Sequence, residues 1–131
     1  MNLLINIDVP ALQPAIDFYC TAFELTLSRM LDDDVAELKG ASSTIYLLEK
    51  DEGSTCSKYS PEIRHYQRHW TPVHFDVVVD DIWQATERAV SAGASIESEC
   101  GEWRESKCIT FSDPFGNGFC LIEFERETYA G

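Results

Sequence analysis

The predicted order of secondary-structure elements occurs twice along the chain, and this repeat restricts the fold more than any single motif does. Residues 3–49 predict a strand, a helix and three strands, and residues 73–131 predict the same order again. A β-α-β-β-β unit leaves one face of a curved sheet open, so two units side by side enclose a cavity. We therefore predict an α+β fold in which two βαβββ modules in tandem form a curved sheet around a pocket.

Local signals support each module. In residues 3–9 polar and apolar side chains alternate as in a strand, and residues 12–23 have one apolar face with helical spacing. In the second module, strands are expected at 73–79, 95–100, 107–112 and 119–125. Asp80 or Asp81 can cap the helix after the first of them, with Gln84 three residues after Asp81 as in a capping box, and Gly93 is a typical helix stop. Residues 113–118 (Asp-Pro-Phe-Gly-Asn-Gly) predict a turn before the last strand.

The predicted boundaries are module one at 1–49, a connection at 50–72 and module two at 73–131, all within one domain, 1–131. The connection contains Gly, Ser and Pro without a sustained period, apart from a short helix expected at 61–70. His65 and His69 would lie on one face of that helix, a spacing that binds metal in some proteins, but a solvated loop helix is the favoured interpretation.

Composition excludes several classes of function. The formal net charge of −13 repels phosphate backbones, so nucleic-acid binding is not expected, whereas cationic ligands are attracted. The same acids also serve solubility. No apolar run is long enough for a membrane helix, and residues 1–10 lack the features of a signal peptide. The five cysteines include no C-x-x-C pair, so we expect free thiols and a cytoplasmic protein.

Three segments resemble the vicinal-oxygen-chelate superfamily, which includes glyoxalase I, bleomycin and fosfomycin resistance proteins and extradiol dioxygenases. They are residues 15–19 (Ala-Ile-Asp-Phe-Tyr), residues 74–77 (His-Phe-Asp-Val) and the turn at 113–118, where Phe115 replaces a frequent aspartate. The resemblance covers nearly the whole chain and implies the glyoxalase/bleomycin-resistance fold and a homodimer. It leaves the function open, because this fold serves enzymes and binding proteins alike.

In the metal-binding members of the superfamily, four ligands come from equivalent strands, and the resemblance places them at Ile5, Tyr46, His74 and Cys120. Only His74 has the usual residue type, and isoleucine has no donor atom. A catalytic zinc generally takes three protein ligands and a water. We therefore expect no metal and no other cofactor.

An alternative places one divalent metal ion on His74, Glu49 and Glu123. Strand alternation puts both glutamates on the face opposite Tyr46 and Cys120, so this site requires a bulge or a shifted register. This alternative site would have one imidazole and two carboxylate ligands, which are donor types that the family uses.

The predicted ligand-binding residues share a position on the inner face or at the pocket wall, and no catalytic residue is assigned. His74 and Asp76 alternate along one strand, where the competing interpretation is a structural hydrogen bond. Trp70, Trp83 and Trp103 are aromatic candidates for a pocket wall, of which Trp103 lies where the family often places one. The predicted set is Tyr46, His74, Asp76, Trp103 and Cys120.

Two classes of function remain. The first is a metal-independent small-molecule binding protein of the bleomycin-resistance type, which sequesters a small cationic or aromatic compound as some antibiotic-resistance proteins do. The second is a glyoxalase-type, metal-dependent lyase or isomerase. A metal-free enzyme with Asp76 or His74 as the base is a third reading of the same residues.

Overall fold

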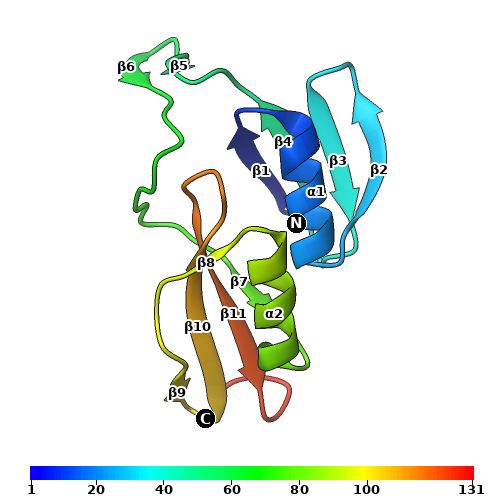
Figure 1. The fold of residues 1–131 in the computed structure, drawn as a ribbon, viewed down its shortest axis with the longest axis vertical. Coiled ribbons are helices and arrows are strands. Elements are labelled where there is room, and N and C mark those ends of the chain that lie inside the picture. Colours follow the sequence, from blue (N-terminus) through cyan, green and yellow to red (C-terminus); the bar gives the residue numbers. More distant parts are fainter. The chain divides into compact units, whose positions relative to one another are not determined.

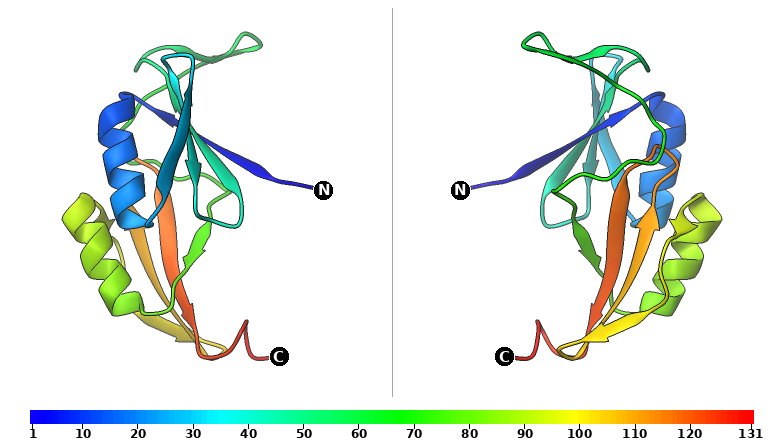
Figure 2. Two further views of the ribbon diagram at one scale, coloured as in Figure 1. Left: turned by 90° about the vertical axis from the view of Figure 1, so that its right-hand side faces the viewer. Right: turned by 90° about the vertical axis from the view of Figure 1, so that its left-hand side faces the viewer.

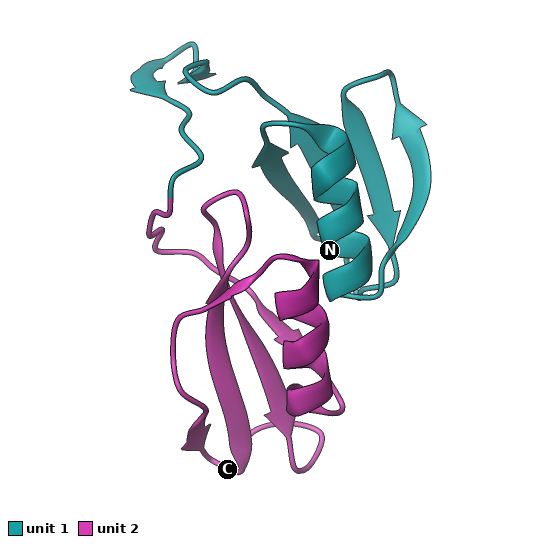
Figure 3. Ribbon diagram, in the orientation of Figure 1, with its two compact units in different colours: residues 1–67 teal, residues 68–131 magenta.

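The computed structural model describes residues 1–131, which form two compact units. Unit 1 comprises residues 1–67 and unit 2 comprises residues 68–131 (Figure 3). In each unit one helix packs on one face of a mixed β-sheet (Figure 1, Figure 2). Neither helix has the length and apolar character needed to cross a membrane.

Unit 1 has the predicted order of elements, followed by a hairpin. Its elements are β1 (Leu4–Val9), α1 (Leu12–Ala22), β2 (Thr26–Leu31), β3 (Val35–Lys39), β4 (Thr44–Glu49), β5 (Thr55–Ser57) and β6 (Ser60–Ile63). The main sheet has the order β1-β4-β3-β2, with β1 parallel to β4 and the other neighbours antiparallel. Ile45 and Leu47 alternate along β4 and are buried, so this unit has its own core.

Unit 2 repeats this topology. Its elements are β7 (Asp76–Val78), α2 (Ile82–Ala92), β8 (Ser95–Ile96), β9 (Gly101–Trp103), β10 (Ser106–Ser112) and β11 (Gly118–Phe124). The sheet has the order β7-β11-β10-β8, with β9 also paired to β10 and β7 parallel to β11. The matching strand orders confirm the predicted pair of βαβββ modules.

Both helices begin and end as local chemistry requires. The Asp81 side chain accepts hydrogen bonds from the N–H groups of Trp83 and Gln84, which confirms the predicted N-cap of α2. Gly93 ends α2 with a φ of 122°, a conformation that glycine adopts readily. The side chain of Ala11, before α1, has no acceptor, and a carboxylate from β4 replaces it, as described below.

Three predicted elements differ from the structure. The strand expected at 73–79 pairs with β11 only over Asp76–Val78. Before it the chain bends at Pro72, and the Thr71 hydroxyl donates a hydrogen bond to the carbonyl oxygen of Val73, which is thereby used locally instead of in the ladder. The strand expected at 95–100 is reduced to β8 (Ser95–Ile96), because the Ser98 hydroxyl accepts the N–H of Thr110 and interrupts the ladder, and a separate short strand, β9, follows at Gly101–Trp103.

The short helix expected at 61–70 is absent. The backbone of Arg64 instead exchanges hydrogen bonds with the opposite strand of the hairpin, donating to Ser54 at 2.8 Å and accepting from Gly53 at 2.7 Å. This ladder keeps the segment extended, so His65 and His69 do not share a helical face.

Candidate functional site

Unit 2 contains a cavity of about 140 Å³. Its lining comes from the segment before β7 and from β10 and β11. The wall is mainly apolar and carries a few polar groups, the composition that small-molecule sites usually have. The lining residues used below are Arg68, Trp70, His74, Thr110, Phe119 and Cys120.

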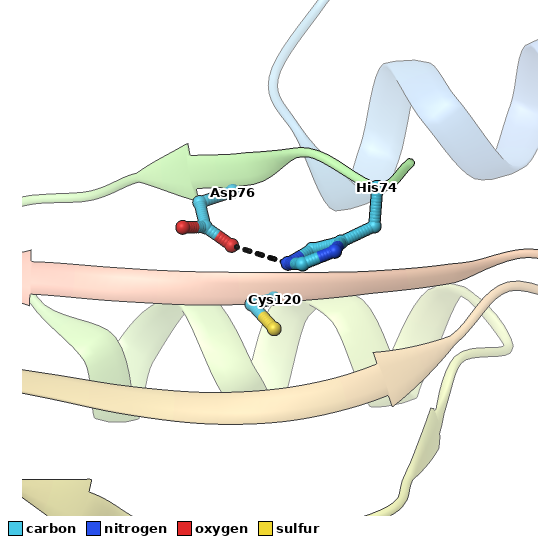
Figure 4. Close-up of side chains that lie close together, drawn as sticks. All are labelled: His74, Asp76 and Cys120. Carbon is cyan, nitrogen blue, oxygen red and sulfur yellow. Dashed lines mark ion pairs between the residues drawn. The ribbon is translucent and has the colours of Figure 1, made fainter. Parts of the chain in front are cut away.

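His74, Asp76 and Cys120 come together at this cavity (Figure 4). Asp76 pairs with Cys120 across the parallel β7–β11 ladder, so their side chains share a face. His74 Nε2 lies 3.5 Å from Asp76 Oδ1, and one donor atom from each residue lies within 4.8 Å of the others. The His74 side chain is 55% exposed, whereas Cys120 is buried. Three of the five predicted ligand-binding residues therefore lie together.

The Cys120 thiol has two further polar neighbours on β10. Its Sγ lies 3.6 Å from the hydroxyl oxygen of Thr110. Cys108, two residues from Thr110 on the same face, forms a hydrogen bond with Cys120. Burial, followed by the charge of Cys120 and this hydrogen bond, raises the pKa of Cys108 to about 12. Cys108 is therefore a neutral thiol near pH 7.

The wall of the cavity is held by Arg68. Its guanidinium donates hydrogen bonds of 2.6 and 2.8 Å to the carboxylate of Glu97 and lies 4.4 Å from the ring centroid of Trp70. The hydrogen bonds from Arg68 lower the pKa of Glu97. A further hydrogen bond from Arg68 reaches the carbonyl oxygen of Gly116. Arg68 thus fixes an indole that is 76% exposed at the edge of the cavity.

Trp103 is not among the residues that line this cavity. It pairs with Ser106 at the turn between β9 and β10, where Arg104 and Glu105 both have positive φ. Its ring packs edge-on against Tyr129, with centroids 5.1 Å apart. Trp70 lines the cavity instead, although the sequence indicated it only as one of three tryptophan candidates for a pocket wall.

Tyr46 belongs to unit 1, where its hydroxyl donates a 2.9 Å hydrogen bond to Glu37. Arg29 donates two more bonds to the same buried carboxylate. Hydrogen bonds from Arg29 and then Tyr46 lower the pKa of Glu37, and the bond to Glu37 raises the pKa of Tyr46. The partner of Tyr46 in the β1–β4 ladder is Asn6, so Ile5 faces the other side of the sheet.

Glu49 and Glu123 hold the two helix N-termini. Glu49 accepts the N–H of Leu12 at 2.9 Å, and Glu123 accepts the N–H of Ile82 at the same distance. A carboxylate there satisfies a free amide and complements the helix dipole. The β10–β11 register is continuous, so no bulge turns Glu123 toward His74. The alternative ligand set of His74, Glu49 and Glu123 is therefore not formed.

The donors that the family's metal site would need are only partly present. Ile5 offers none, and the Tyr46 hydroxyl is already donated to Glu37. His74, Asp76 and Cys120 supply an imidazole, a carboxylate and a thiol from one unit, a set that suits a borderline ion such as Zn²⁺. The residues present thus fit a three-donor site in unit 2 and do not reproduce the four-ligand site.

Comparisons with known proteins support the same fold. The sequence model of the glyoxalase-like domain family matches residues 4–122. Among curated proteins, none shows significant sequence similarity to this chain.

Solved structures share the fold at low identity. A hypothetical protein from S. aureus has a TM-score of 0.73 and 17% identity, covering 94% of this chain and 93% of its own. Fosfomycin resistance protein FosX from Listeria monocytogenes has a TM-score of 0.70 and 18% identity, with coverages of 92% and 88%. Lactoylglutathione lyase from Agrobacterium tumefaciens has a TM-score of 0.66 and 18% identity, with coverages of 98% and 97%.

Proposed function

Since this chain belongs to the glyoxalase-like domain family of the vicinal-oxygen-chelate superfamily, we propose that it binds a small aromatic cation in the unit 2 cavity without a metal. The observation that carries the proposal is an apolar cavity with an exposed indole at its edge and a carboxylate beside it. The family includes both enzymes and resistance proteins, so membership alone does not select this function.

The two ends of the cavity favour different parts of such a ligand. Trp70 offers a large flat surface, and Arg68 already occupies a position over its ring, so a flat apolar group suits the indole better than a second cation. The Asp76 side chain, which is 36% exposed and lies 3.5 Å from His74, supplies negative charge for the cationic group of the ligand. A cavity of roughly 150 Å³ accommodates one benzene ring.

The charge of the chain supports a cationic ligand. A formal net charge of −13 attracts cations and raises their rate of association at low ionic strength. The Glu37 carboxylate in unit 1 is paired with Arg29 and accepts a hydrogen bond from Tyr46, so it offers no comparable free charge. Two carboxylates lie beside residues of the cavity lining: Glu97 is doubly hydrogen-bonded to Arg68, whereas Asp76 lies beside the half-exposed His74.

Binding of benzyltrimethylammonium tests this proposal, with toluene and tetramethylammonium as matched half-ligands. We expect the aromatic cation to raise the melting temperature and quench tryptophan fluorescence more than either half-ligand. Trp70→Ala should abolish the effect, whereas Trp83→Ala, an exposed tryptophan on α2 outside the cavity lining, should preserve it. An equal response in both variants would refute the proposal.

A second candidate function is metal-dependent lyase or isomerase chemistry of the glyoxalase type. The observation that favours it is the gathering of His74, Asp76 and Cys120 donor atoms within 4.8 Å. A bound ion there would act as a Lewis acid on a substrate oxygen. Elemental analysis after incubation with Zn²⁺ and desalting should then show one equivalent of zinc per chain. Both His74→Ala and Cys120→Ser should lose this zinc. Retention of less than roughly a tenth of an equivalent, which is about the background, excludes this second function.

A homodimer and a cytoplasmic location remain predictions. Size-exclusion chromatography with light scattering measures the first directly. A role in antibiotic resistance is likewise a prediction, and it would require the natural ligand to be a toxic compound.

A further inference from the structure

The wall of the cavity includes the thiol of Cys120. Cys120 lies at the middle of β11, is 8% exposed and lines the same cavity as Trp70 and His74. The binding function proposed above uses the indole and the carboxylate, and it leaves this sulfur without a role. A buried thiol is usually a small apolar residue, but three polar groups surround this one.

The neighbours of Cys120 are those that activate a nucleophile. A donor atom of His74 lies within 4.8 Å of the sulfur, and Asp76 lies 3.5 Å from His74 Nε2. The imidazole is half exposed, and contacts between a base and a nucleophile are often long before a ligand binds. The Thr110 hydroxyl, 3.6 Å from Sγ, is placed to donate a hydrogen bond to a thiolate.

We propose that Cys120 captures electrophilic ligands of the cavity covalently, and that these are small α,β-unsaturated carbonyl compounds. This inference goes beyond the proposed binding of an aromatic cation, and it rests on that proposal only for an apolar cavity that a small ligand can enter. His74 is the proton acceptor, and Asp76 is a positioning residue that stabilises the imidazolium. Cys108 stays protonated beside them and does not compete.

The step balances without a further reactant. His74 accepts the thiol proton, and the Cys120 sulfur forms a bond to the β-carbon of the ligand. The electron pair of the carbon–carbon double bond moves to the carbonyl oxygen and gives an enolate. The imidazolium of His74 then returns the proton to the α-carbon. The products are a thioether and a neutral imidazole.

N-ethylmaleimide tests the proposal on the full chain, because it is a small unsaturated carbonyl compound whose adduct is found by peptide mass mapping. All five cysteines are free, and exposed Cys56 serves as the internal reference. We expect Cys120 to react at least as fast as Cys56 although it is buried. His74→Asn should slow labelling of Cys120 at least about tenfold and leave Cys56 unchanged.

Two further variants separate chemistry from structure. Asp76→Asn should slow labelling of Cys120, and Asp76→Glu should restore part of the rate. Failure of Cys120 to react, or an equal rate in His74→Asn, overturns the inference. Reversible binding of benzyltrimethylammonium by Cys120→Ser reports on the cavity function separately, so that function survives a negative labelling result.

Discussion

Replacement of Gly118 by alanine adds only one methyl group, yet it should disturb the cavity. A Cβ built on Gly118 would lie 2.7 Å from a terminal nitrogen of Arg68, closer than real Cβ atoms approach any group. A flexible arginine would normally move away at little cost. Here the guanidinium is fixed by Glu97 and by the ring of Trp70, so movement breaks those contacts.

The expected cost follows from those contacts. The Arg68–Glu97 pair is about a quarter exposed and doubly hydrogen-bonded, so its loss costs about 1–2 kcal/mol. Loss of the contact with Trp70 adds about 0.5–1 kcal/mol. Alanine recovers about 0.4–1 kcal/mol by restricting the unfolded chain. Gly118→Ala should therefore lower the free energy of unfolding by about 1–2 kcal/mol and weaken ligand binding at the cavity.

Urea denaturation followed by tryptophan fluorescence measures this change. Gly101→Ala is the matched control, because its Cβ would meet the nearest atom at an ordinary 3.9 Å in the same sheet. Combination with Glu97→Gln tests the mechanism, since the cost of Gly118→Ala should shrink once the pair is already lost. Full additivity of the two substitutions, or equal stability of both glycine variants, would refute the reasoning.

Two other predictions concern unit 2. Asp113 accepts hydrogen bonds from the N–H of Phe115, the N–H of Asn117 and the Asn117 side chain. Asp113→Ala should therefore lower the free energy of unfolding, measured by urea denaturation, by about 2–4 kcal/mol, and Asp113→Asn should lower it less. Equal losses in the two variants would contradict this reasoning. The lowered pKa of Glu97 stabilises the folded state above its ordinary value of 4.5, and this contribution is lost as pH falls through the lowered value. Glu97→Gln should therefore reduce stability at pH 7 and make no difference near pH 2, and a deficit independent of pH would show that ionisation plays no part.

Short-range patterns accounted for much of the fold. The N-cap of α2, its glycine stop and the turn at 113–118 each depend on residues a few positions apart, so the sequence contains their full chemistry. Strand alternation also placed Glu49 and Glu123 opposite the open face, where the structure has them.

The cavity wall depended on long-range partners instead. Arg68 is fixed by Glu97, 29 residues away in the sequence, and no local pattern indicates that pairing. The segment before β7 was expected to be helical, which would have turned Trp70 elsewhere. Trp103 was chosen from its expected place between two strands, but it belongs to the short strand β9 and lies at the turn to β10.

The carboxylates of Glu49 and Glu123 have a consequence for how such a chain can change. Each ties the last sheet strand of its module to the start of that module's own helix, so the tie closes within the half that supplies it. Exchange of one half between two chains would therefore leave both ties intact. A fold with this property can be duplicated, swapped or recombined at the junction between residues 67 and 68 without rebuilding either helix start.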